Sequence, residues 1–301
     1  MSTLFPGTHE HRVQTGDAEI FARIGGKGPP LLLVHGFPQT HAMWHRIAPE
    51  LMRQFTCVLP DLRGYGLSSC PENTRDNRPY SKRAMAADLV TLMASLGHRK
   101  FAIAGHDRGA RVTYRLALDH PGSVIAAAVL DIVPTLEMWN AMDAASAMNA
   151  YHWLFLAQPN PLPEMLIEQA PVGYLDYTLA SWTAAKHLNA FHPDALSEYR
   201  THYATPDHIH ATCNDYRAGQ TCDAADDQAD LAAGRKIAAP LLAIWGDSGF
   251  PAKAKDPLAV WQRWASNVSG APVKAGHFIA EENPQETLSH LLPFFAKHCG
   301  A

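Results

Sequence analysis

The chain has 301 residues, of which 47% are hydrophobic and 18% are charged, a composition typical of a globular protein. Its formal net charge of −4 leaves no broad basic surface, so we expect no nucleic acid among its partners. Five scattered cysteines without a C-x-x-C pair favour neither a disulfide framework nor a zinc site. The polar N-terminus and the lack of an apolar run of about 20 residues predict a cytoplasmic protein that does not enter a membrane.

Strand and helix patterns alternate in the first 134 residues. Weak alternation over residues 10–24 predicts a hairpin at the edge of a sheet. Helices are expected over 44–52 and from Ser81 onward, where the serine can cap the first turn. Continuous apolar runs, typical of strands buried on both faces, occur at 31–34, 55–59, 101–104 and 126–130. This order indicates a mostly parallel sheet flanked by helices, and ligands bind beyond the carboxyl ends of such strands.

The pattern changes between about Pro134 and Leu231. Aromatic and methionine side chains are dense there, helical spacing persists and strand signals vanish. We interpret this part as a helical cap inserted into an α/β core, although additional core helices would give a similar pattern. The predicted division is a first core part at 1–134, a cap at 135–231 and a second core part at 232–301. The second core part is expected to contain a strand at 240–245, a helix near 258–264, a short strand at 273–275 and a final helix over 283–298.

The pentapeptide Gly105-His106-Asp107-Arg108-Gly109 lies between a predicted strand and a predicted helix. Glycines at both ends allow the sharp turn of a nucleophile elbow, which presents its central side chain at the N-terminus of a helix. Asp107 takes the position at which serine is common. Attack on a saturated carbon by serine would leave an ether, whereas attack by a carboxylate leaves an ester that water can hydrolyse. A glycine-rich turn with a capping aspartate is the structural alternative.

A late histidine and two aspartates complete the candidate catalytic set. His277 follows the last predicted strand, which matches the chain order of nucleophile, acid and base in this kind of fold. It could activate water as a general base. Asp131 ends the strand after the elbow helix, and Asp247 ends the strand after the cap. Both aspartates therefore remain candidates to orient His277.

Two arginines and one loop could bind negative charge beside Asp107. Arg108 and Arg111 lie three residues apart and share one face of the elbow helix, where two guanidinium groups suit a carboxylate. Cations oppose the helix dipole at an N-terminus, which favours a functional interpretation, while pairing with a structural acid is the alternative. The loop His35-Gly36-Phe37-Pro38 follows a strand, so the backbone N–H groups of Phe37 and Arg108 are candidates for an oxyanion site.

Several motifs together make the chain resemble the fluoroacetate (haloacetate) dehalogenases of the α/β-hydrolase fold over essentially its whole length. The run Asp-Arg-Gly-Ala-Arg at 107–111, together with His152-Trp153 in the cap, is the most specific of them. The stretches at 35–38 and 105–107 are also shared with soluble epoxide hydrolases. Further matching stretches are His35-Gly36-Phe37-Pro38-Gln39-Thr40, Asp61-Leu62-Arg63-Gly64-Tyr65-Gly66 and Gly276-His277-Phe278.

This resemblance implies a role for each of the core candidates. The family's nucleophile falls on Asp107, its general base on His277 and the acid that orients the base on Asp131. The two arginines that hold the substrate carboxylate fall on Arg108 and Arg111. Family members work without a metal or an organic cofactor, so we expect none here.

The resemblance also implies a halide site in the cap, where the spacing of aromatic residues alone would favour ordinary core packing. The halide donors of the family fall on His152, Trp153 and Tyr216. Few anchors surround Tyr216 in the sequence, so Tyr199 or Tyr203 could take its role. Because family members are homodimers that act on small haloacids, we expect a haloacid substrate and a second copy of the chain as partners.

Other functions of the same fold compete with this prediction. A soluble epoxide hydrolase would use the same Asp107 and His277, with two cap tyrosines to protonate the epoxide oxygen and no carboxylate clamp. A haloalkane dehalogenase usually has an apolar residue or tryptophan directly after the nucleophile, which Arg108 disfavours. A ligand-binding member without catalysis would have no need of Asp107, His277 and Asp131 together.

Overall fold

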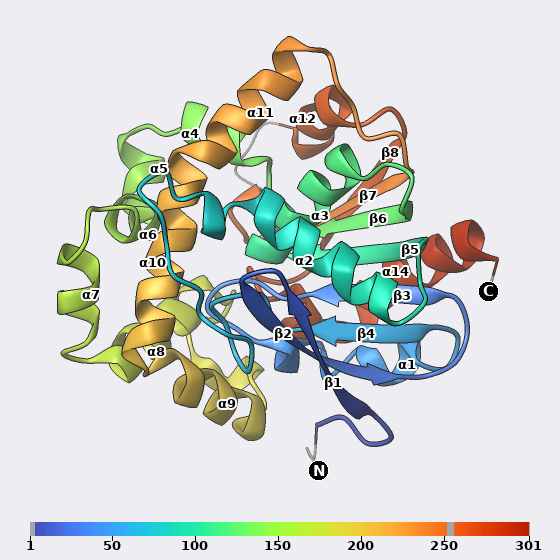
Figure 1. Cartoon of the computed structure of the whole chain (residues 1–301), viewed down its shortest axis with the longest axis horizontal. Coiled ribbons are helices and arrows are strands. Elements are labelled where there is room, and N and C mark those ends of the chain that lie inside the picture. Colours follow the sequence, from blue (N-terminus) through green and yellow to red (C-terminus); the bar gives the residue numbers. More distant parts are fainter. Residues whose placement is uncertain (1–3, 252–255, 301) are drawn as a thin grey trace.

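The computed structural model describes residues 4–251 and 256–300, and these residues form an eight-stranded sheet covered by helices (Figure 1). The strand order is β1-β2-β4-β3-β5-β6-β7-β8. The first two strands pair antiparallel, β2 is antiparallel to β4, and every other neighbouring pair is parallel. The strands are β1 (His9–Thr15), β2 (Ala18–Gly25), β3 (Pro30–Val34), β4 (Thr56–Pro60), β5 (Phe101–His106), β6 (Val124–Leu130), β7 (Leu241–Gly246) and β8 (Val268–Val273). The predicted α/β class with a mostly parallel sheet is confirmed.

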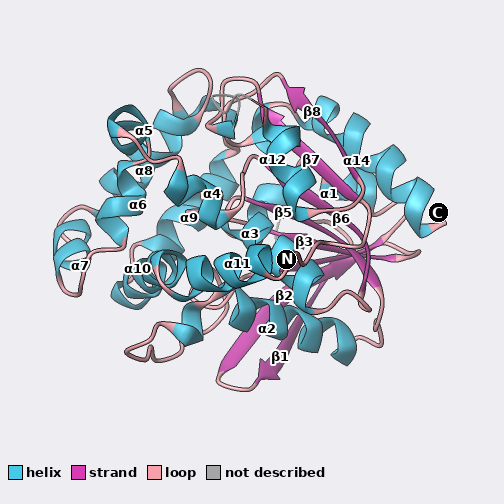
Figure 2. Cartoon of the chain, turned by 90° about the horizontal axis from the view of Figure 1, so that it is seen from above, coloured by secondary structure: helices cyan, strands magenta, loops and turns pink. Residues whose placement is uncertain are grey.

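Helices cover both faces of this sheet because its central strands are apolar on both sides. Every residue of β5 is buried, as are four of the five residues of β3. Tyr114 of α3 stacks edge-on against Trp261 of α12, so these two helices share one face, and Phe55 contacts Phe295 of α14. Figure 2 shows the sheet from above, with helices on either side of it. The core helices are α1 (Ala48–Leu51), α2 (Lys82–Ser95), α3 (Arg108–Asp119), α12 (Pro257–Trp264), α13 (Ile279–Glu282) and α14 (Pro284–Cys299).

Two predicted elements differ in the structure. The helix expected over 44–52 is a short 3-10 turn at His41–Trp44 followed by α1, because Pro49 lacks the N–H that would continue a helix and instead lies in the first turn of a new one. The strand expected at 273–275 is β8 at Val268–Val273. Its sequence Val-Ser-Gly-Ala-Pro-Val gives a weak strand signal, but a Cβ on Gly270 would lie 2.0 Å from the Ala243 carbonyl oxygen, so the glycine allows close pairing with β7.

All elements between β6 and β7 are helical, and we name the helices α4–α11 the cap. Figure 1 shows the cap beside the carboxyl ends of the strands, on the left of the view. The division of the chain at residues 134 and 231 stays a prediction. The cap helices are α4 (Thr135–Asn140), α5 (Ala144–Asn149), α6 (Tyr151–Leu156), α7 (Leu162–Ile167), α8 (Pro171–Trp182), α9 (Pro193–Tyr203), α10 (Pro206–Gln220) and α11 (Cys222–Ala232).

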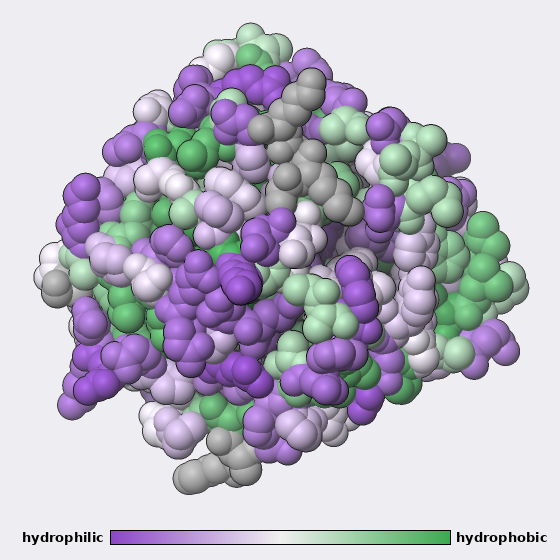
Figure 3. Space-filling view, turned by 180° about the vertical axis from the view of Figure 1, so that it is seen from behind, coloured by the Kyte–Doolittle hydropathy of each residue, from purple (hydrophilic) through white to green (hydrophobic). Residues whose placement is uncertain are grey.

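The surface of the cap is unusually apolar. Among the described residues, every large hydrophobic side chain that is exposed lies in the cap, apart from Leu67. In the view from behind, hydrophobic residues gather at the right-hand edge, where the cap lies (Figure 3). None of the described helices is long and apolar enough to cross a membrane. The exposed cap residues are Met148, Leu154, Leu162, Met165, Leu166, Val172 and Tyr177.

Candidate active site

The turn between β5 and α3 has the backbone geometry of a nucleophile elbow. Asp107 has φ 48° and ψ −117°, a conformation that non-glycine residues rarely adopt. A Cβ on Gly105 would lie 2.4 Å from the Gly109 carbonyl oxygen, and a Cβ on Gly109 would lie 2.2 Å from the His35 carbonyl oxygen. Only glycine fits at these two positions, so the sequence itself dictates the tight turn. The strained turn presents Asp107 at the N-terminus of α3.

The carboxylate of Asp107 is buried between the backbone at Phe37 and the imidazole ring of His277. Its Oδ1 accepts a hydrogen bond from the Phe37 N–H at 2.9 Å, and its Oδ2 lies 3.8 Å from His277 Nε2. Burial raises the pKa of Asp107, but the charges of His277, His106 and the neighbouring arginines outweigh burial and lower the pKa overall. The carboxylate is therefore ionised at neutral pH and able to act as a nucleophile.

His277 is held by Asp131 and not by Asp247. Its Nδ1 lies 2.5 Å from Asp131 Oδ2, while Asp131 Oδ1 accepts the Gly246 N–H at 2.9 Å. Asp247 is exposed, and its carboxylate accepts a hydrogen bond from the Ser248 hydroxyl at 3.1 Å. Burial lowers the pKa of His277, but the hydrogen bond and the charge of Asp131 raise the pKa more. Of the two candidates left open by the strand pattern, Asp131 has the geometry that orients the imidazole.

Arg111 lies on the cavity side of α3. Its Nη1 donates to the Val133 carbonyl oxygen at 3.0 Å and to the Thr135 hydroxyl at 3.2 Å, and its guanidinium stacks 4.5 Å from the centre of the Trp153 ring. Its Nε is buried and has no hydrogen-bond partner in the described structure. Burial and the nearby Arg108 both lower the pKa of Arg111. An anion in the cavity would therefore relieve an uncompensated positive charge.

Arg108 has a different environment, because a cap carboxylate already binds it. Asp215 of α10 accepts from Arg108 Nε at 3.0 Å and from Nη2 at 2.6 Å, and the Asp215 carbonyl oxygen also accepts from Nη2 at 2.7 Å. Only Nη1 is left without a partner among the described residues. Pairing with an acid, which the sequence left open for this arginine, thus occurs at two of its three nitrogens. Sequence reasoning missed Asp215.

The cap aromatics meet above Asp107. The ring centres of His152 and Tyr216 lie 5.7 Å apart, and those of Trp153 and Tyr216 lie 6.1 Å apart. Within the described chain, the buried Tyr216 hydroxyl and His152 Nδ1 have no hydrogen-bond partners. Burial lowers the pKa of His152 to about 3, so its ring is neutral. By contrast, the Tyr199 hydroxyl is engaged by Glu281 at 3.3 Å, which leaves Tyr216 as the better donor of the two.

A cavity of about 130 Å³ lies between Asp107 and His277 of the core and His152 and Trp153 of the cap. It can hold a ligand of only a few non-hydrogen atoms. Trp182, whose ring centre lies 4.4 Å from that of His152, also contributes to the wall. Arg108 and Tyr216 are not among the residues that line the cavity. The predicted site residues that do line it are Asp107, Arg111, Asp131, His152, Trp153 and His277.

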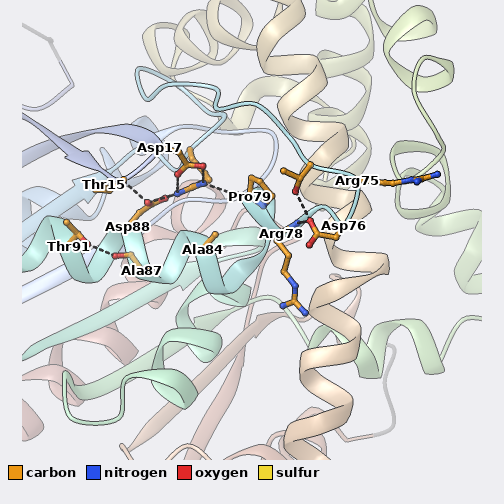
Figure 4. Close-up of a pocket in the computed structure, with 13 residues that line it drawn as sticks. Thr15, Asp17, Arg75, Asp76, Arg78, Pro79, Ala84, Ala87, Asp88 and Thr91 are labelled. Atoms are coloured by element: carbon orange, nitrogen blue, oxygen red, sulfur yellow. Dashed lines mark hydrogen bonds and ion pairs between the residues drawn. The ribbon is translucent and has the colours of Figure 1, made fainter.

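A wider hollow of about 880 Å³ lies elsewhere, along α2 and the turn between β1 and β2 (Figure 4). Its charged side chains bind one another: Arg63 Nε donates to Asp88 at 2.6 Å, and Arg63 Nη2 lies 3.1 Å from Asp17. Because its one buried cation is already neutralised, this hollow offers no comparable binding chemistry.

The elbow, the histidine after the last strand and the carboxylate after β6 together define an α/β hydrolase, in which a helical cap closes the site. Comparison with known proteins agrees: the family model of the alpha/beta hydrolase fold matches residues 29–284. A crystal structure of an α/β hydrolase from Nostoc sp. PCC 7120 superposes with a TM-score of 0.93 at 47% identity, covering 96% of this chain and 98% of that one.

Two curated relatives are similar over nearly the whole length. A fluoroacetate dehalogenase from Burkholderia sp. is 42% identical over 97% of this chain and 95% of that protein. A soluble epoxide hydrolase from Corynebacterium sp. strain C12 is 34% identical over 96% of this chain and 97% of that protein. The chain therefore belongs to the fluoroacetate dehalogenase family of the α/β-hydrolase fold. It is a hydrolase, and the family resemblance seen in its motifs is confirmed.

Proposed function

We propose that this protein is a hydrolytic dehalogenase that converts fluoroacetate and other haloacetates to glycolate and halide. The observation that carries the proposal is the combination of an ionised Asp107 with Arg111, a buried cation without an ion pair among the described residues, in a cavity of about 130 Å³. A small carboxylate with a leaving group on its α-carbon matches both groups. The identity of 42% to a fluoroacetate dehalogenase supports the same substrate class.

The first step is displacement at the α-carbon. Arg111 and the free Nη1 of Arg108 hold the substrate carboxylate. An oxygen of Asp107 attacks the α-carbon from the side opposite the halide, a carbon–oxygen bond forms, and the carbon–halogen bond breaks with its electron pair leaving on the halide. His152, Trp153 and Tyr216 donate hydrogen bonds to the departing ion, and the unpartnered Tyr216 hydroxyl supports this assignment.

The second step is hydrolysis of the aspartyl ester. His277 Nε2 takes a proton from water, whose oxygen attacks the Asp107 carboxyl carbon, and Asp131 stabilises the imidazolium. The Phe37 N–H, already 2.9 Å from Asp107 Oδ1, and the N–H of Arg108 stabilise the oxyanion. Collapse of the tetrahedral intermediate breaks the ester bond, and the His277 imidazolium gives its proton to the departing glycolate oxygen. The Asp107 carboxyl then loses its proton to water, which restores the carboxylate. Ester formation removes the negative charge of Asp107, one cause of the raised pKa of His277, so the base is more readily neutral when it is needed.

Isotope labelling and product analysis test this proposal. Wild-type enzyme should release fluoride and glycolate from fluoroacetate, measured with a fluoride electrode and by chromatography. In a single turnover in heavy-oxygen water, the label should enter Asp107, and the first glycolate released should carry none. Label in that glycolate would mean that water attacks the substrate directly, and the covalent route would be wrong.

Epoxide hydrolysis is the second candidate, because a soluble epoxide hydrolase is 34% identical over 96% of this chain. The same Asp107 and His277 would serve, and Tyr203 could join Tyr216, because both hydroxyls are buried without a partner in the part of the chain that the structure describes. The two buried arginines, Arg108 and Arg111, argue against this candidate, because a neutral epoxide has no negative charge for them to bind. Turnover of styrene oxide without any halide release from haloacetates would favour the epoxide hydrolase.

We further propose that the protein forms a homodimer through the cap. The exposed apolar residues of the cap, which include Met148, Leu166 and Tyr177, support this because such a patch is costly to leave in water. Leu166→Lys should convert dimer to monomer in sedimentation experiments, whereas Leu67→Lys, at the exposed apolar residue outside the cap, should not. A monomeric wild-type protein would refute the proposal.

A further inference from the structure

Asp215 is a buried carboxylate of the cap that binds two cations of the core. It ion-pairs with Lys82, the first residue of α2, and with Arg108, the first residue of α3. The Tyr65 hydroxyl donates to Asp215 Oδ2 at 2.7 Å. The side chains of Lys82 and Arg108 are 1% exposed and that of Asp215 is fully buried. Because burying three charges is costly, an arrangement of this kind calls for an explanation beyond packing.

The contacts of Arg108 leave one of its nitrogens free. Asp215 occupies Nε and Nη2, and the Tyr216 ring lies 4.2 Å beneath the guanidinium carbon. Nη1 is buried and has no partner in residues 4–251 and 256–300. A buried N–H without an acceptor is rare in proteins, and Arg108 directly follows Asp107, so this donor is available to a ligand bound at Asp107.

The charge of Lys82 decides whether Arg108, once paired with Asp215, still attracts an anion. Arg108 and Asp215 alone would form a neutral pair, and Lys82 restores one positive charge to the group. Asp223 also faces Lys82, but its Oδ2 lies 3.7 Å from Nζ, beyond hydrogen-bond distance, whereas Asp215 is in direct contact with Nζ, so the charge of Lys82 acts mainly on Asp215. Lys82 therefore compensates for the carboxylate that orients Arg108.

We propose that Asp215 is a positioning residue, which fixes Arg108 so that its Nη1 binds the substrate carboxylate, and that Lys82 keeps the Arg108–Asp215 pair net positive. This inference rests on the proposed function, because it assumes that the ligand carries a carboxylate. It makes a cap residue responsible for aligning a core residue, so the clamp is complete only with the cap in place.

A second ion pair on the same helix provides a matched control. Arg115, also on α3, pairs with Asp230 of cap helix α11, and Asp230 is shared with a second cation, Arg235. Arg115 and Asp230 are as buried as the first pair, at 2% and 1% exposed. Like Arg108 and Asp215, they do not line the cavity, but Asp230 pairs with Arg115 and Arg235 and has no ion pair with Arg108 or Arg111 in the described structure. Substitution of Asp230 therefore causes the same kind of damage to cap packing without touching the carboxylate clamp.

The experiment compares Asp215→Asn and Asp215→Ala with Asp230→Asn and Asp230→Ala. Binding of acetate, an unreactive carboxylate, is measured by calorimetry, and chloride release from chloroacetate gives KM and kcat. We expect the acetate Kd and the KM to rise about 10-fold in Asp215→Asn, which keeps one acceptor oxygen, and more in Asp215→Ala. Both Asp230 variants should stay within about twofold of wild type, although thermal unfolding should show a similar loss of stability in the two series.

Lys82→Met keeps the proposal testable if the Asp215 variants do not fold, because it leaves Arg108 and Asp215 paired. It should weaken acetate binding about 3- to 10-fold through loss of one positive charge. Unchanged acetate affinity in folded Asp215 variants would overturn the positioning role, and unchanged affinity in Lys82→Met would overturn the charge compensation. Acetate binding needs no turnover, so a wild-type enzyme that binds acetate but releases no halide would instead refute the proposed function.

Discussion

The core and the cap contribute site residues of opposite character. The catalytic side chains of the core are hydrogen-bonded before any ligand enters, whereas Arg108 and Arg111 each keep an unpartnered nitrogen among the described residues. Phe37 holds Asp107, Asp131 holds His277, and Gly246 holds Asp131. The cap donors of Tyr216 and His152 are buried and have no partner among the described residues. The preorganised catalytic groups suit the steps common to all substrates, and the unpartnered donors of the cap face the proposed leaving group, which varies between substrates. We therefore expect the core to determine the reaction and the cap to determine which leaving group is accepted.

The largest expected effect lies in the core, at the base. His277→Asn should still allow Asp107 to displace the halide, but it removes the group that activates water, which contributes about 10²- to 10⁴-fold in typical enzymes. Chloroacetate should therefore give one equivalent of chloride per site and then stop. Mass spectrometry should find the glycolyl ester on the peptide that contains Asp107. Steady turnover by this variant would mean that another group serves as the base.

The next effect separates the two aspartates that follow strands. Asp131→Asn should reduce kcat by about 10³- to 10⁴-fold, because a misoriented imidazole of the wrong tautomer is a poor base. Asp247→Asn is the matched control, since Asp247 is exposed and its carboxylate binds only Ser248 among the described residues. Its kcat should stay within about twofold of wild type. The reverse pattern would make Asp247 the acid.

Local signals were enough to predict most of the core site. The glycines around Asp107 and the strand ends before Asp131 and His277 each depend on a few neighbouring residues. The choice between Asp131 and Asp247 could not be derived from these signals, because both residues follow strands. That choice depends on which carboxylate reaches His277, and the structure shows a distance of 2.5 Å for Asp131.

The cap contacts could not be predicted in this way. Asp215 lies 107 residues from Arg108 and 133 residues from Lys82 along the chain, so its ion pairs depend on how α10 packs against two core helices. An aspartate on a helix more often faces water, and nothing nearby in the sequence marks this one as buried. The role of Tyr216 likewise came only from the family resemblance.

A smaller and more selective effect is expected in the cap. The Trp153 ring lies 4.5 Å from the Arg111 guanidinium. Trp153→Phe keeps a ring on which Arg111 can stack and removes one N–H donor. Fluoride is the poorest leaving group and the strongest hydrogen-bond acceptor among the halides. Defluorination should fall about 10- to 1000-fold, and dechlorination much less, measured as kcat/KM for fluoroacetate and chloroacetate.

Two variants sharpen this result. Trp139 is the neighbouring ring, and its N–H donates to the Gly219 carbonyl oxygen at 3.1 Å. Trp139→Phe should therefore lower stability and affect fluoroacetate and chloroacetate equally. Arg111→Ala should slow both substrates to a similar extent, because it binds the carboxylate that they share. Equal losses for the two halides in Trp153→Phe would contradict the halide site and return Trp153 to a packing role.

The smallest effect is a shift in pH dependence, and it again separates core from cap. The pKa of His277 is raised above 6.5, since the hydrogen bond and charge of Asp131, with help from Asp107, outweigh burial. A base must be neutral, so ester hydrolysis should rise with pH through the pKa of His277. In the ester Asp107 carries no charge, so this pKa should be lower than in the free enzyme. Burial lowers the pKa of His152 in the cap to about 3, so it adds no step in the same range.

Nuclear magnetic resonance of the imidazole in free enzyme gives the first pKa, and the pH profile of single-turnover ester hydrolysis gives the second. His152→Gln should leave the position of both unchanged, because a neutral ring contributes no charge to His277. If the hydrolysis profile is centred above the free-enzyme pKa of His277, the expected effect of the Asp107 charge is wrong. That result would mean that the protonated imidazole is more stable after Asp107 has lost its negative charge. A shift caused by His152→Gln would show that the cap, too, controls the base, and the division of labour between the two regions would then be wrong.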